Sequence, residues 1–338
     1  MDRATLDGIP EASVARGAAV ERGIAASVAY LGSELARRSL AVDLYWPKWD
    51  SPWWHMLLLH ELGEARRIPA SAVTAMVDGL DRFPLHHFPI HPGDAPPGTD
   101  PHRDILCHCA LGSVLQVLAA CGVDVAQAVA WAAPWFARYQ MADGGFNCDE
   151  RAYLEAERTG ACPSSMVGTV ALFEAMQVIG RPRAELDRGA QFLIGRALTE
   201  GSATLYNAEE RAAAPAWRAL CFPRFYFYDV LRGLAALVAW AEATGQAVPR
   251  AAVEGVVDEL VARFPDGVVR IGRRAYDGRT TLVPAADPAP SERRPAATFA
   301  LLDAASAIGE PSEPLTRQWA AARRGLIRLI DAGRLPAG

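Results

Sequence analysis

The sequence lacks several features that would place it in a common class of protein. Basic residues are not in excess, since 34 lysines and arginines face 39 acidic residues and the net charge is −5. Without a basic stripe that could follow a phosphate backbone, we expect no nucleic-acid partner. The chain does not start with an apolar stretch of the kind found in secretory signals, so we expect a cytoplasmic protein. It also has no glycine-flanked serine nucleophile and no glycine-rich phosphate loop, which argues against serine hydrolases and nucleotide-binding proteins.

Long uncharged stretches are scarce as well. The longest, residues 105–123, approaches the length of a membrane-spanning helix. It contains cysteine, histidine, serine and glutamine side chains, and its neighbours are charged. We therefore interpret it as a helix buried inside a large protein, and we expect no transmembrane segment.

What the sequence does contain is a repeated pattern of paired helices. Five times a hydrophobic helix is followed by a short break, a second helix and a long polar loop. The first helices are expected to begin near Ser51, Arg103, Pro163, Pro223 and Pro295. Spacings of roughly 50 to 70 residues with two helices in each unit are typical of an array of helical hairpins. The long loops would all emerge at one rim, where binding and catalytic groups usually lie. They cover residues 84–102, 140–162, 200–222 and 265–294.

The two helices of a pair differ in character. The first is nearly uncharged and rich in small residues, whereas the second carries surface charges, which is typical of buried inner helices wrapped by an amphipathic outer layer. A linear array would need polar caps at both ends, and the first repeat, rich in tryptophan and leucine, does not offer one. We predict an all-α protein in which residues 1–338 form a single domain, a closed α/α toroid of five to six hairpins. Residues 51–334 supply five repeats, and residues 1–50 complete the ring with a helix over 11–38 and a short extended segment at 42–45.

A short motif follows the second helix of the second pair. Its sequence is Gln140-Met141-Ala142-Asp143-Gly144-Gly145-Phe146, and a degenerate copy at residues 264–268 follows the second helix of the fourth pair. The motif resembles the glutamine–aspartate–glycine–aromatic repeat of squalene and oxidosqualene cyclases and of protein prenyltransferase β subunits. Residues 223–233 are similar to a segment of bacterial squalene-cyclase or prenyltransferase repeat proteins. In those families the repeats brace a toroid, so Gln140, Asp143, Gly144, Gly145 and Phe146 are expected to be structural.

The resemblance implies an enzyme that acts on an isoprenoid or other apolar small molecule in a central cavity, with help from an acid. The aspartate-rich motifs of terpene cyclases are missing from this sequence, so the acid must come from elsewhere. Asp149 and Glu150 follow the motif directly, and two carboxylates in different environments suit general acid–base chemistry. Asp149 is the better candidate because it lies between a cysteine and the start of an expected inner helix. The alternative is that both are solvated loop residues.

Aromatic residues gather where inner helices are expected to begin. Ring faces stabilise cations, as carbocation chemistry requires, but the same rings would also serve to fill a core. The expected substrate-binding residues are Trp53, Trp54, Phe225, Phe227, Ser164 and Ser165, the serines because a helix N-terminus suits an anion. We expect Tyr226, Tyr228 and Asp229 to add a hydrogen-bonded polar group of catalytic residues.

A second hypothesis is a zinc-dependent enzyme on the same fold. The metal candidates are Cys107, His108, Cys109, Cys148 and Cys162, which lie at the start of an inner helix and around the following loop; soft thiolates and imidazole suit zinc. Residues two apart on a helix point in different directions, so Cys107 and Cys109 are not both expected to reach one ion. Buried thiols without a metal are the alternative, because free cysteine is often buried. A third hypothesis is a binding or scaffold protein without catalytic activity.

Overall fold

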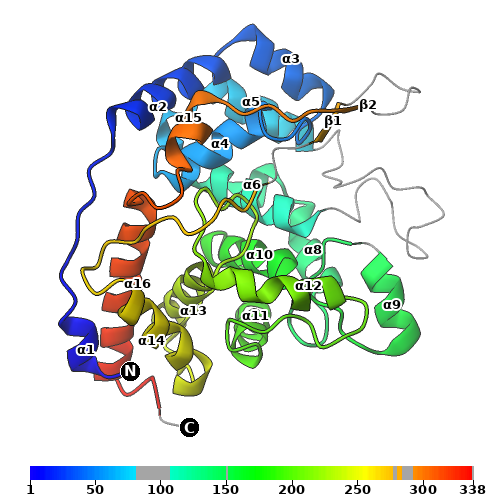
Figure 1. The fold of residues 1–338 in the computed structure, drawn as a ribbon. Helices are drawn as coiled ribbons and strands as arrows, with labels where there is room; N and C mark the ends of the chain where they lie inside the picture. Colours follow the sequence, from blue (N-terminus) through cyan, green and yellow to red (C-terminus); the bar gives the residue numbers. More distant parts are fainter. Residues whose placement is uncertain (81–106, 150, 277–279, 284–291, 337–338) are drawn as a thin grey trace.

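The computed structural model describes residues 1–80, 107–149, 151–276, 280–283 and 292–336. Within these ranges the chain is mostly helical, as predicted, and adds one small antiparallel sheet (Figure 1). The α-helices are α1 (Arg3–Asp7), α2 (Ala18–Leu31), α3 (Glu34–Val42), α4 (Pro52–Glu61), α5 (Ala70–Leu80), α6 (His108–Ala120), α7 (Val125–Ala128), α8 (Ala132–Tyr139), α9 (Arg151–Thr159), α10 (Met166–Val178), α11 (Arg183–Gly195), α12 (Ala208–Ala213), α13 (Val230–Thr244), α14 (Glu254–Arg263), α15 (Ala300–Ala305) and α16 (Glu313–Asp331). The strands are β1 (Thr281–Val283) and β2 (Glu292–Arg294).

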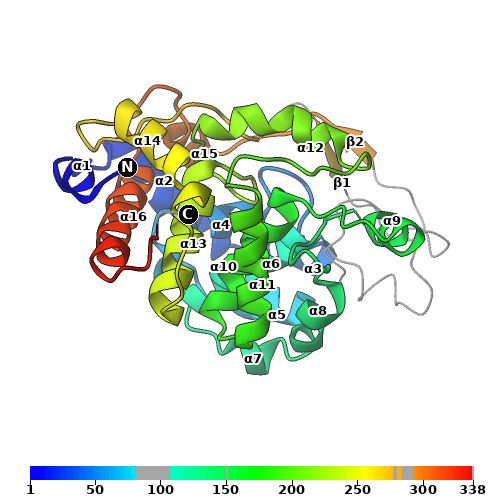
Figure 2. The same cartoon turned by 90° about the horizontal axis from the view of Figure 1, so that it is seen from below.

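Helices α4, α6, α10 and α13 form the buried centre of the molecule, and they are the first helices of the first four predicted pairs. Helix α4 is rich in leucine and tryptophan, and the other three are rich in leucine, valine and alanine, so burial on nearly all sides stabilises each of them. Helix α6 packs against α4 and α10, α10 against α13, and α13 against α16. Helix α16 is amphipathic and lies at the edge, opposite the projecting α9 (Figure 2). No helix in the described ranges is both long and apolar enough to cross a membrane.

The contact between α6 and α10 brings two backbones close together. A Cβ atom at Gly112 of α6 would lie 2.4 Å from the carbonyl carbon of Ala171 in α10. One turn further along α6, the side-chain amide of Gln116 donates a hydrogen bond of 2.9 Å to the carbonyl oxygen of Ala171. A side chain larger than hydrogen at position 112 would therefore push the two central helices apart.

The glycine-rich motif joins α8 to α10 through a set of specific hydrogen bonds. The carboxylate of Asp143 accepts the N–H of Gly145 at 3.1 Å and closes the turn. The N–H of Ser165, which caps α10, donates to the carbonyl oxygen of Phe146 at 2.8 Å. The N–H of Phe146 in turn donates to the hydroxyl of Thr169 at 2.9 Å. The turn is thus fixed to the first turn of the next buried helix.

The degenerate copy of the motif joins α14 to α16 in the same way. The carboxylate of Asp266 accepts the N–H of Val268 at 3.0 Å. The N–H of Ser312, which caps α16, donates to the carbonyl oxygen of Val269 at 2.8 Å. The N–H of Val269 in turn donates to the hydroxyl of Thr316 at 2.9 Å. Each of the three bonds has its counterpart in the α8–α10 joint. The two segments therefore repeat one structural unit, although little of their sequence is shared.

Several expected boundaries were wrong. The helix expected from Pro223 begins seven residues later as α13, because Phe225 has a positive φ of 53° and the carboxylate of Asp229 caps the helix at Arg232 N–H, 2.9 Å away. The expected helix over 11–38 is divided into α2 and α3, where Ser33 caps the second helix. The extended segment expected at 42–45 begins one residue later, at Asp43, because α3 continues to Val42.

The loops also contain elements that were not expected. The loop over 140–162 holds α9, the loop over 200–222 holds α12, and the loop over 265–294 holds β1 and β2. The helix expected from Pro295 begins at Ala300 as α15. The expected start at Arg103 lies outside the described residues, and α6 is described from His108.

We predict that Gly112→Ala lowers the free energy of unfolding by about 1–3 kcal/mol, because the new methyl group has no room between α6 and α10. Urea denaturation measures this change. The matched control is Gly255→Ala, at an exposed position of α14 where no atom lies within 4 Å of the new methyl group. The control should be neutral or slightly stabilising. Equal effects of the two substitutions would contradict the close approach of α6 and α10.

Candidate functional site

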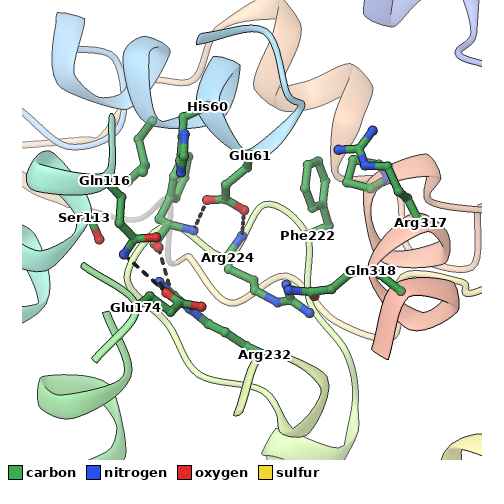
Figure 3. A pocket seen from close by; sticks show the side chains of 14 residues that line it. His60, Glu61, Ser113, Gln116, Glu174, Phe222, Arg224, Arg232, Arg317 and Gln318 are labelled. Carbon is green, nitrogen blue, oxygen red and sulfur yellow. Dashed lines mark hydrogen bonds and ion pairs between the residues drawn. The ribbon is translucent and has the colours of Figure 1, made fainter. Parts of the chain in front are cut away.

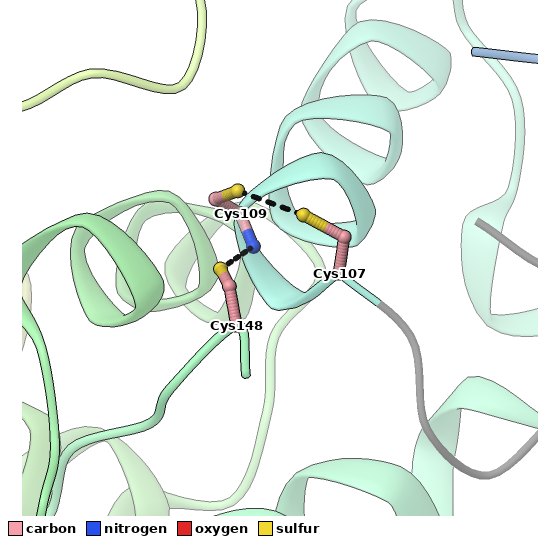
Figure 4. Close-up of side chains that lie close together, drawn as sticks. All are labelled: Cys107, Cys109 and Cys148. Carbon is pink, nitrogen blue, oxygen red and sulfur yellow. Dashed lines mark hydrogen bonds between the residues drawn. The ribbon is translucent and has the colours of Figure 1, made fainter. Parts of the chain in front are cut away.

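Three cysteines from two segments of the chain meet at the start of α6 (Figure 4). The sulfur atoms of Cys107, Cys109 and Cys148 all lie within 4.8 Å of one another, and those of Cys107 and Cys109 are 3.1 Å apart. The N–H of Cys109 donates to the sulfur of Cys148 at 3.3 Å. Cys107 and Cys109 are buried and Cys148 is partly exposed. We call these three residues the thiol cluster.

The expectation that Cys107 and Cys109 would point apart was wrong. Cys107 is the N-cap residue of α6 and has extended backbone angles, φ −64° and ψ 100°, so it lies outside the regular helix. Its side chain does not follow the helical rotation that separates residues two apart. The end of the helix, rather than its face, brings the two thiols together.

A buried lysine lies beside the thiol cluster. The ammonium nitrogen of Lys48 is 2.9 Å from the hydroxyl oxygen of Tyr226 and lies over the rings of Tyr45, Trp49 and Tyr226, 5.1 to 5.2 Å from their centroids. Burial lowers the pKa of Lys48 to about 8, and the three neighbouring thiols act against this shift because thiolates favour the charged ammonium. Lys48 therefore supplies a positive charge next to sulfur atoms that can become negative.

Without a cation, the thiols are held in their neutral form. Burial raises the pKa of Cys109 well above its usual value, and hydrogen bonding to Cys107 and Cys109 raises the pKa of Cys148. A bound metal ion would reverse this effect, since a coordinating thiol loses its proton. Tetrahedral zinc with zinc–sulfur distances of about 2.3 Å needs sulfur atoms about 3.8 Å apart. The sulfur atoms of the thiol cluster are 3.1 Å apart in the closest pair and no more than 4.8 Å apart in any pair, so small side-chain movements would let the three residues bind zinc.

The other expected metal ligands do not join the thiol cluster. Nδ1 of His108 is hydrogen-bonded to the carbonyl oxygen of Asn147 and lies 3.1 Å from the hydroxyl of Tyr153. Burial lowers the pKa of His108 to about 4, so its ring is neutral. Cys162 is half-buried and is not among the grouped thiols. The histidines of the loop over 84–102 lie outside the described residues.

The expected acid Asp149 is held as a carboxylate. It forms an ion pair with Arg151 at 3.1 Å and accepts a hydrogen bond of 2.7 Å from the hydroxyl of Tyr206. Burial would raise its pKa, but these hydrogen bonds outweigh burial and the pKa is lowered. A group that is ionised so readily is a poor proton donor at neutral pH. Glu150 lies outside the described residues.

The remaining expected catalytic residues are divided between two places. Tyr226 lies beside Lys48, whereas Tyr228 donates a hydrogen bond of 2.8 Å to the carbonyl oxygen of Leu198. Asp229 is fully buried and paired with Arg224. Tyr228 and Asp229 therefore have partners within the fold.

Most of the expected substrate-binding residues belong to the core. Trp53, Trp54 and Phe225 are 2%, 0% and 1% exposed. Trp49 stacks on Phe225 with 5.6 Å between the ring centroids, and Phe227 packs against the same tryptophan. Ser165 caps α10, and Ser164 donates to Asp143 at 2.7 Å. The tryptophans fill space, and the serines stabilise the joint between α8 and α10.

The glutamine of the motif is also part of that joint. Its side-chain amide donates to the carbonyl oxygen of Gly144 at 3.0 Å and to that of Glu185 at 2.9 Å. Gln140 thereby ties the turn to α11. Both acceptors are backbone carbonyl oxygens, one within the turn and one 45 residues away in the sequence.

A polar cavity of about 450 Å³ lies between α4, α6, α10, α13 and α16 (Figure 3). Of the expected substrate-binding residues, only Phe225 lines it. Its other walls carry polar and charged side chains as well as a few apolar ones. They include His60, Glu61, Ser113, Gln116, Glu174, Phe222, Arg224, Arg232, Arg317 and Gln318. The cavity begins one helical turn from the thiol cluster, because the hydroxyl of Ser113 donates to the carbonyl oxygen of Cys109 at 2.8 Å.

Lys48 and Glu61 were not expected to be functional. Lys48 lies between two tryptophans in Trp46-Pro47-Lys48-Trp49, and Glu61 is the only acidic residue of the apolar helix α4. A charged residue within an apolar stretch of sequence is the signal that could have identified each of them, since burial of an ion needs compensation.

Comparison of the chain with protein-family models, with curated proteins and with solved structures finds no match. Its chemistry must therefore be argued from its own residues.

We predict that Asp149→Asn lowers the free energy of unfolding by about 1 kcal/mol at pH 7, since it weakens the bonds to Arg151 and Tyr206. Because the folded-state pKa is lowered, the stabilisation is present above pH 4 and is lost as the pH falls through the folded-state value. Urea denaturation at pH 7 and at pH 3 should show a smaller difference between the two proteins at pH 3. Glu200→Gln, at an exposed position, is the control. A difference that does not change with pH would contradict the ion pair.

Proposed function

We propose that the protein is a zinc-dependent enzyme whose metal centre is the thiol cluster. The observation that carries the proposal is the convergence of Cys107, Cys109 and Cys148 within 4.8 Å. Thiolate sulfur is the ligand type that zinc and other soft ions favour. Two of the thiols come from the start of α6 and the third from the loop after the glycine-rich motif, so the folded chain brings them together.

The charges around the thiol cluster support a divalent ion. Zinc with three thiolates carries one net negative charge, which is costly in a buried place unless a positive charge lies nearby. The ammonium group of Lys48 supplies that charge, and it is held by Tyr226 and by aromatic ring faces. Lys48 thus balances the loaded centre.

The number of ligands favours catalysis over a purely structural ion. Catalytic zinc sites commonly have three protein ligands and one open position, and the ion acts there as a Lewis acid. Within the described ranges, the thiol cluster provides three ligands. Lys48, with its pKa lowered to about 8 by burial, and the hydroxyl of Tyr226 to which it donates would be able to hold or pass a proton near the thiol cluster.

We also propose that the helical hairpins close into a toroid. The succession of contacts from α4 through α6, α10 and α13 to α16 supports this architecture. Arg16 supports it as well, because its guanidinium reaches both Glu64, just after α4, and Glu313 at the start of α16. The guanidinium of Arg323 in α16 donates to the carbonyl oxygens of Leu6 and Ile9, which ties the N-terminal segment to the same helix.

Acid-assisted chemistry on an isoprenoid or other apolar substrate is a second proposal, and it rests on the glycine-rich motif and its matched copy. The buried ion pairs in the wall of the cavity and the ion pair of Asp149 give it less support than the metal centre has. Incubation with squalene and polyprenyl diphosphates tests it, and recovery of every substrate unchanged would remove it. The third possibility, a non-catalytic binding protein, predicts neither turnover nor a bound metal.

We predict about one equivalent of zinc per chain in protein purified without chelators or metal-affinity resin. Elemental analysis measures the metal. The double substitution Cys107→Ser/Cys109→Ser should abolish binding, whereas Cys121→Ser, outside the thiol cluster, should retain it. Wild-type protein with less than about a tenth of an equivalent of any transition metal, even after incubation with zinc, would refute the metal centre.

Cobalt in place of zinc tests whether the fourth position is open. The sulfur-to-cobalt absorption should correspond to three thiolates, and the cobalt bands should shift when imidazole or a small thiol is added, as an open position requires. Absence of any shift would indicate a fourth ligand from the protein and a structural ion.

Removal of the charge of Lys48 should weaken the metal centre. We predict that Lys48→Met lowers zinc affinity by about 10- to 100-fold, the range found when groups that support metal ligands are replaced. Competition with a chelator of known affinity measures the change. Unchanged affinity in a folded Lys48→Met protein would show that the ammonium does not balance the thiolates.

A further inference from the structure

The cavity between α4, α6, α10, α13 and α16 contains two ion pairs that neutralise its arginines. The guanidinium of Arg224 is paired with Asp229 through contacts of 2.6 and 3.0 Å. The guanidinium of Arg232, in α13, is paired with Glu174 of α10 through contacts of 2.6 to 3.1 Å (Figure 3). Each pair joins one positive and one negative charge, so neither leaves a net charge in the wall.

Glu61 also lines the cavity, and its carboxylate belongs to neither of these ion pairs. Its two carboxylate oxygens accept the backbone N–H groups of Arg224 and Phe225, at 2.7 and 2.5 Å, and it forms no ion pair with any described residue. Figure 3 shows the carboxylate of Glu61 between the α4 backbone and the loop that contains Arg224. A carboxylate has room for about four hydrogen bonds, so two remain for a molecule in the cavity.

The other titratable groups around Glu61 do not cancel its charge. Burial lowers the pKa of His60, which is therefore neutral at pH 7. Arg317 of α16 is half-exposed at the edge and is paired with Glu313. Burial raises the pKa of Glu61 itself to about 7, although the two N–H groups and the guanidiniums of Arg232 and Arg224 act in the opposite direction. Ionised Glu61 gives the cavity one uncompensated negative charge.

We propose that this cavity binds a small molecule that carries a protonated amine, with Glu61 as its counter-ion. A carboxylate in a partly enclosed site attracts a cation far more strongly than it does in water. The amides of Gln116 and Gln318 can accept or donate hydrogen bonds to the rest of the molecule, and the ring of Phe222 offers an apolar surface. A volume of about 450 Å³ suits a ligand of modest size. The site is separate from the thiol cluster and needs no metal.

Benzylamine and benzyl alcohol are suitable probes, because they have nearly the same shape and benzylamine remains protonated between pH 5.5 and 8. Calorimetric titration of the full-length protein should show that benzylamine binds on the order of 10-fold more tightly at pH 8 than at pH 5.5, since Glu61 loses its proton and becomes negatively charged as the pH rises through this interval. Benzyl alcohol should bind weakly and equally at both values. Equal binding of the two probes at pH 8, or no binding of benzylamine, would overturn the proposal.

Glu61→Gln keeps the shape of the side chain and removes its charge. It should lower benzylamine affinity at pH 8 by on the order of 10-fold and abolish the pH dependence, whereas Glu200→Gln should bind as the wild type does. If Glu61→Gln does not fold, the pH comparison on the wild type decides the question alone. Zinc content should be the same in both variants, so failure of the amine site and failure of the metal centre are distinguishable. Full affinity in a folded Glu61→Gln protein would also overturn the proposal.

Discussion

A charge that is moved out of water must be matched by an opposite charge or by several hydrogen bonds, and this requirement governs the centre of the molecule. Arg224 and Arg232 are accepted there because Asp229 and Glu174 lie beside them. Lys48 is accepted because ring faces and Tyr226 surround its ammonium group. Glu61 is only partly matched, by two backbone N–H groups. Among the described charged groups that line the cavity, Glu61 is the one that forms no ion pair.

Helices α4 and α6 connect the thiol cluster and the cavity physically. On α6, Cys109 belongs to the thiol cluster, and Ser113, one turn later, lines the cavity. On α4, Trp54 packs in the aromatic core and Glu61, two turns later, lines the cavity. Phe225 stacks on Trp49 and also lines the cavity. Because Cys109 and Ser113 lie one turn apart on α6, that helix fixes the distance between the thiol cluster and the cavity.

Much of the helical arrangement could be read from the sequence, because periodic apolar residues and capping signals act locally. The buried helices α4, α6, α10 and α13 and the surface helix α16 all followed from such patterns. The start of α13 could not be predicted, since it depends on the positive φ of Phe225 and on the capping carboxylate of Asp229. The closed ring stays a prediction, because it concerns contacts between segments far apart in the chain.

The candidate sites were harder to predict than the helices. The cysteines were identified by residue type, but their convergence depends on Cys107 being a cap rather than a helical residue. Asp149 looked suitable because it lies near the motif, yet hydrogen bonds from Arg151 and from Tyr206, which is distant in sequence, lower its pKa and keep it ionised. Glu61 is a single acidic residue at the end of an apolar helix, and this pattern alone does not predict a binding site. Its importance comes from the pairing of its neighbours, which no local pattern reveals.

The two matched joints show how few side chains a bonding scheme needs. Each consists of an aspartate turn, a capping serine and a threonine hydroxyl that receives a backbone N–H, and the joints follow α8 and α14. The joint between them, after α11, is built differently, with Asp229 as the cap. The chain between the turn and the capping serine also differs, since one joint encloses α9 and the other encloses β1, β2 and α15. Three polar side chains at fixed places therefore build the same joint in segments whose remaining residues differ.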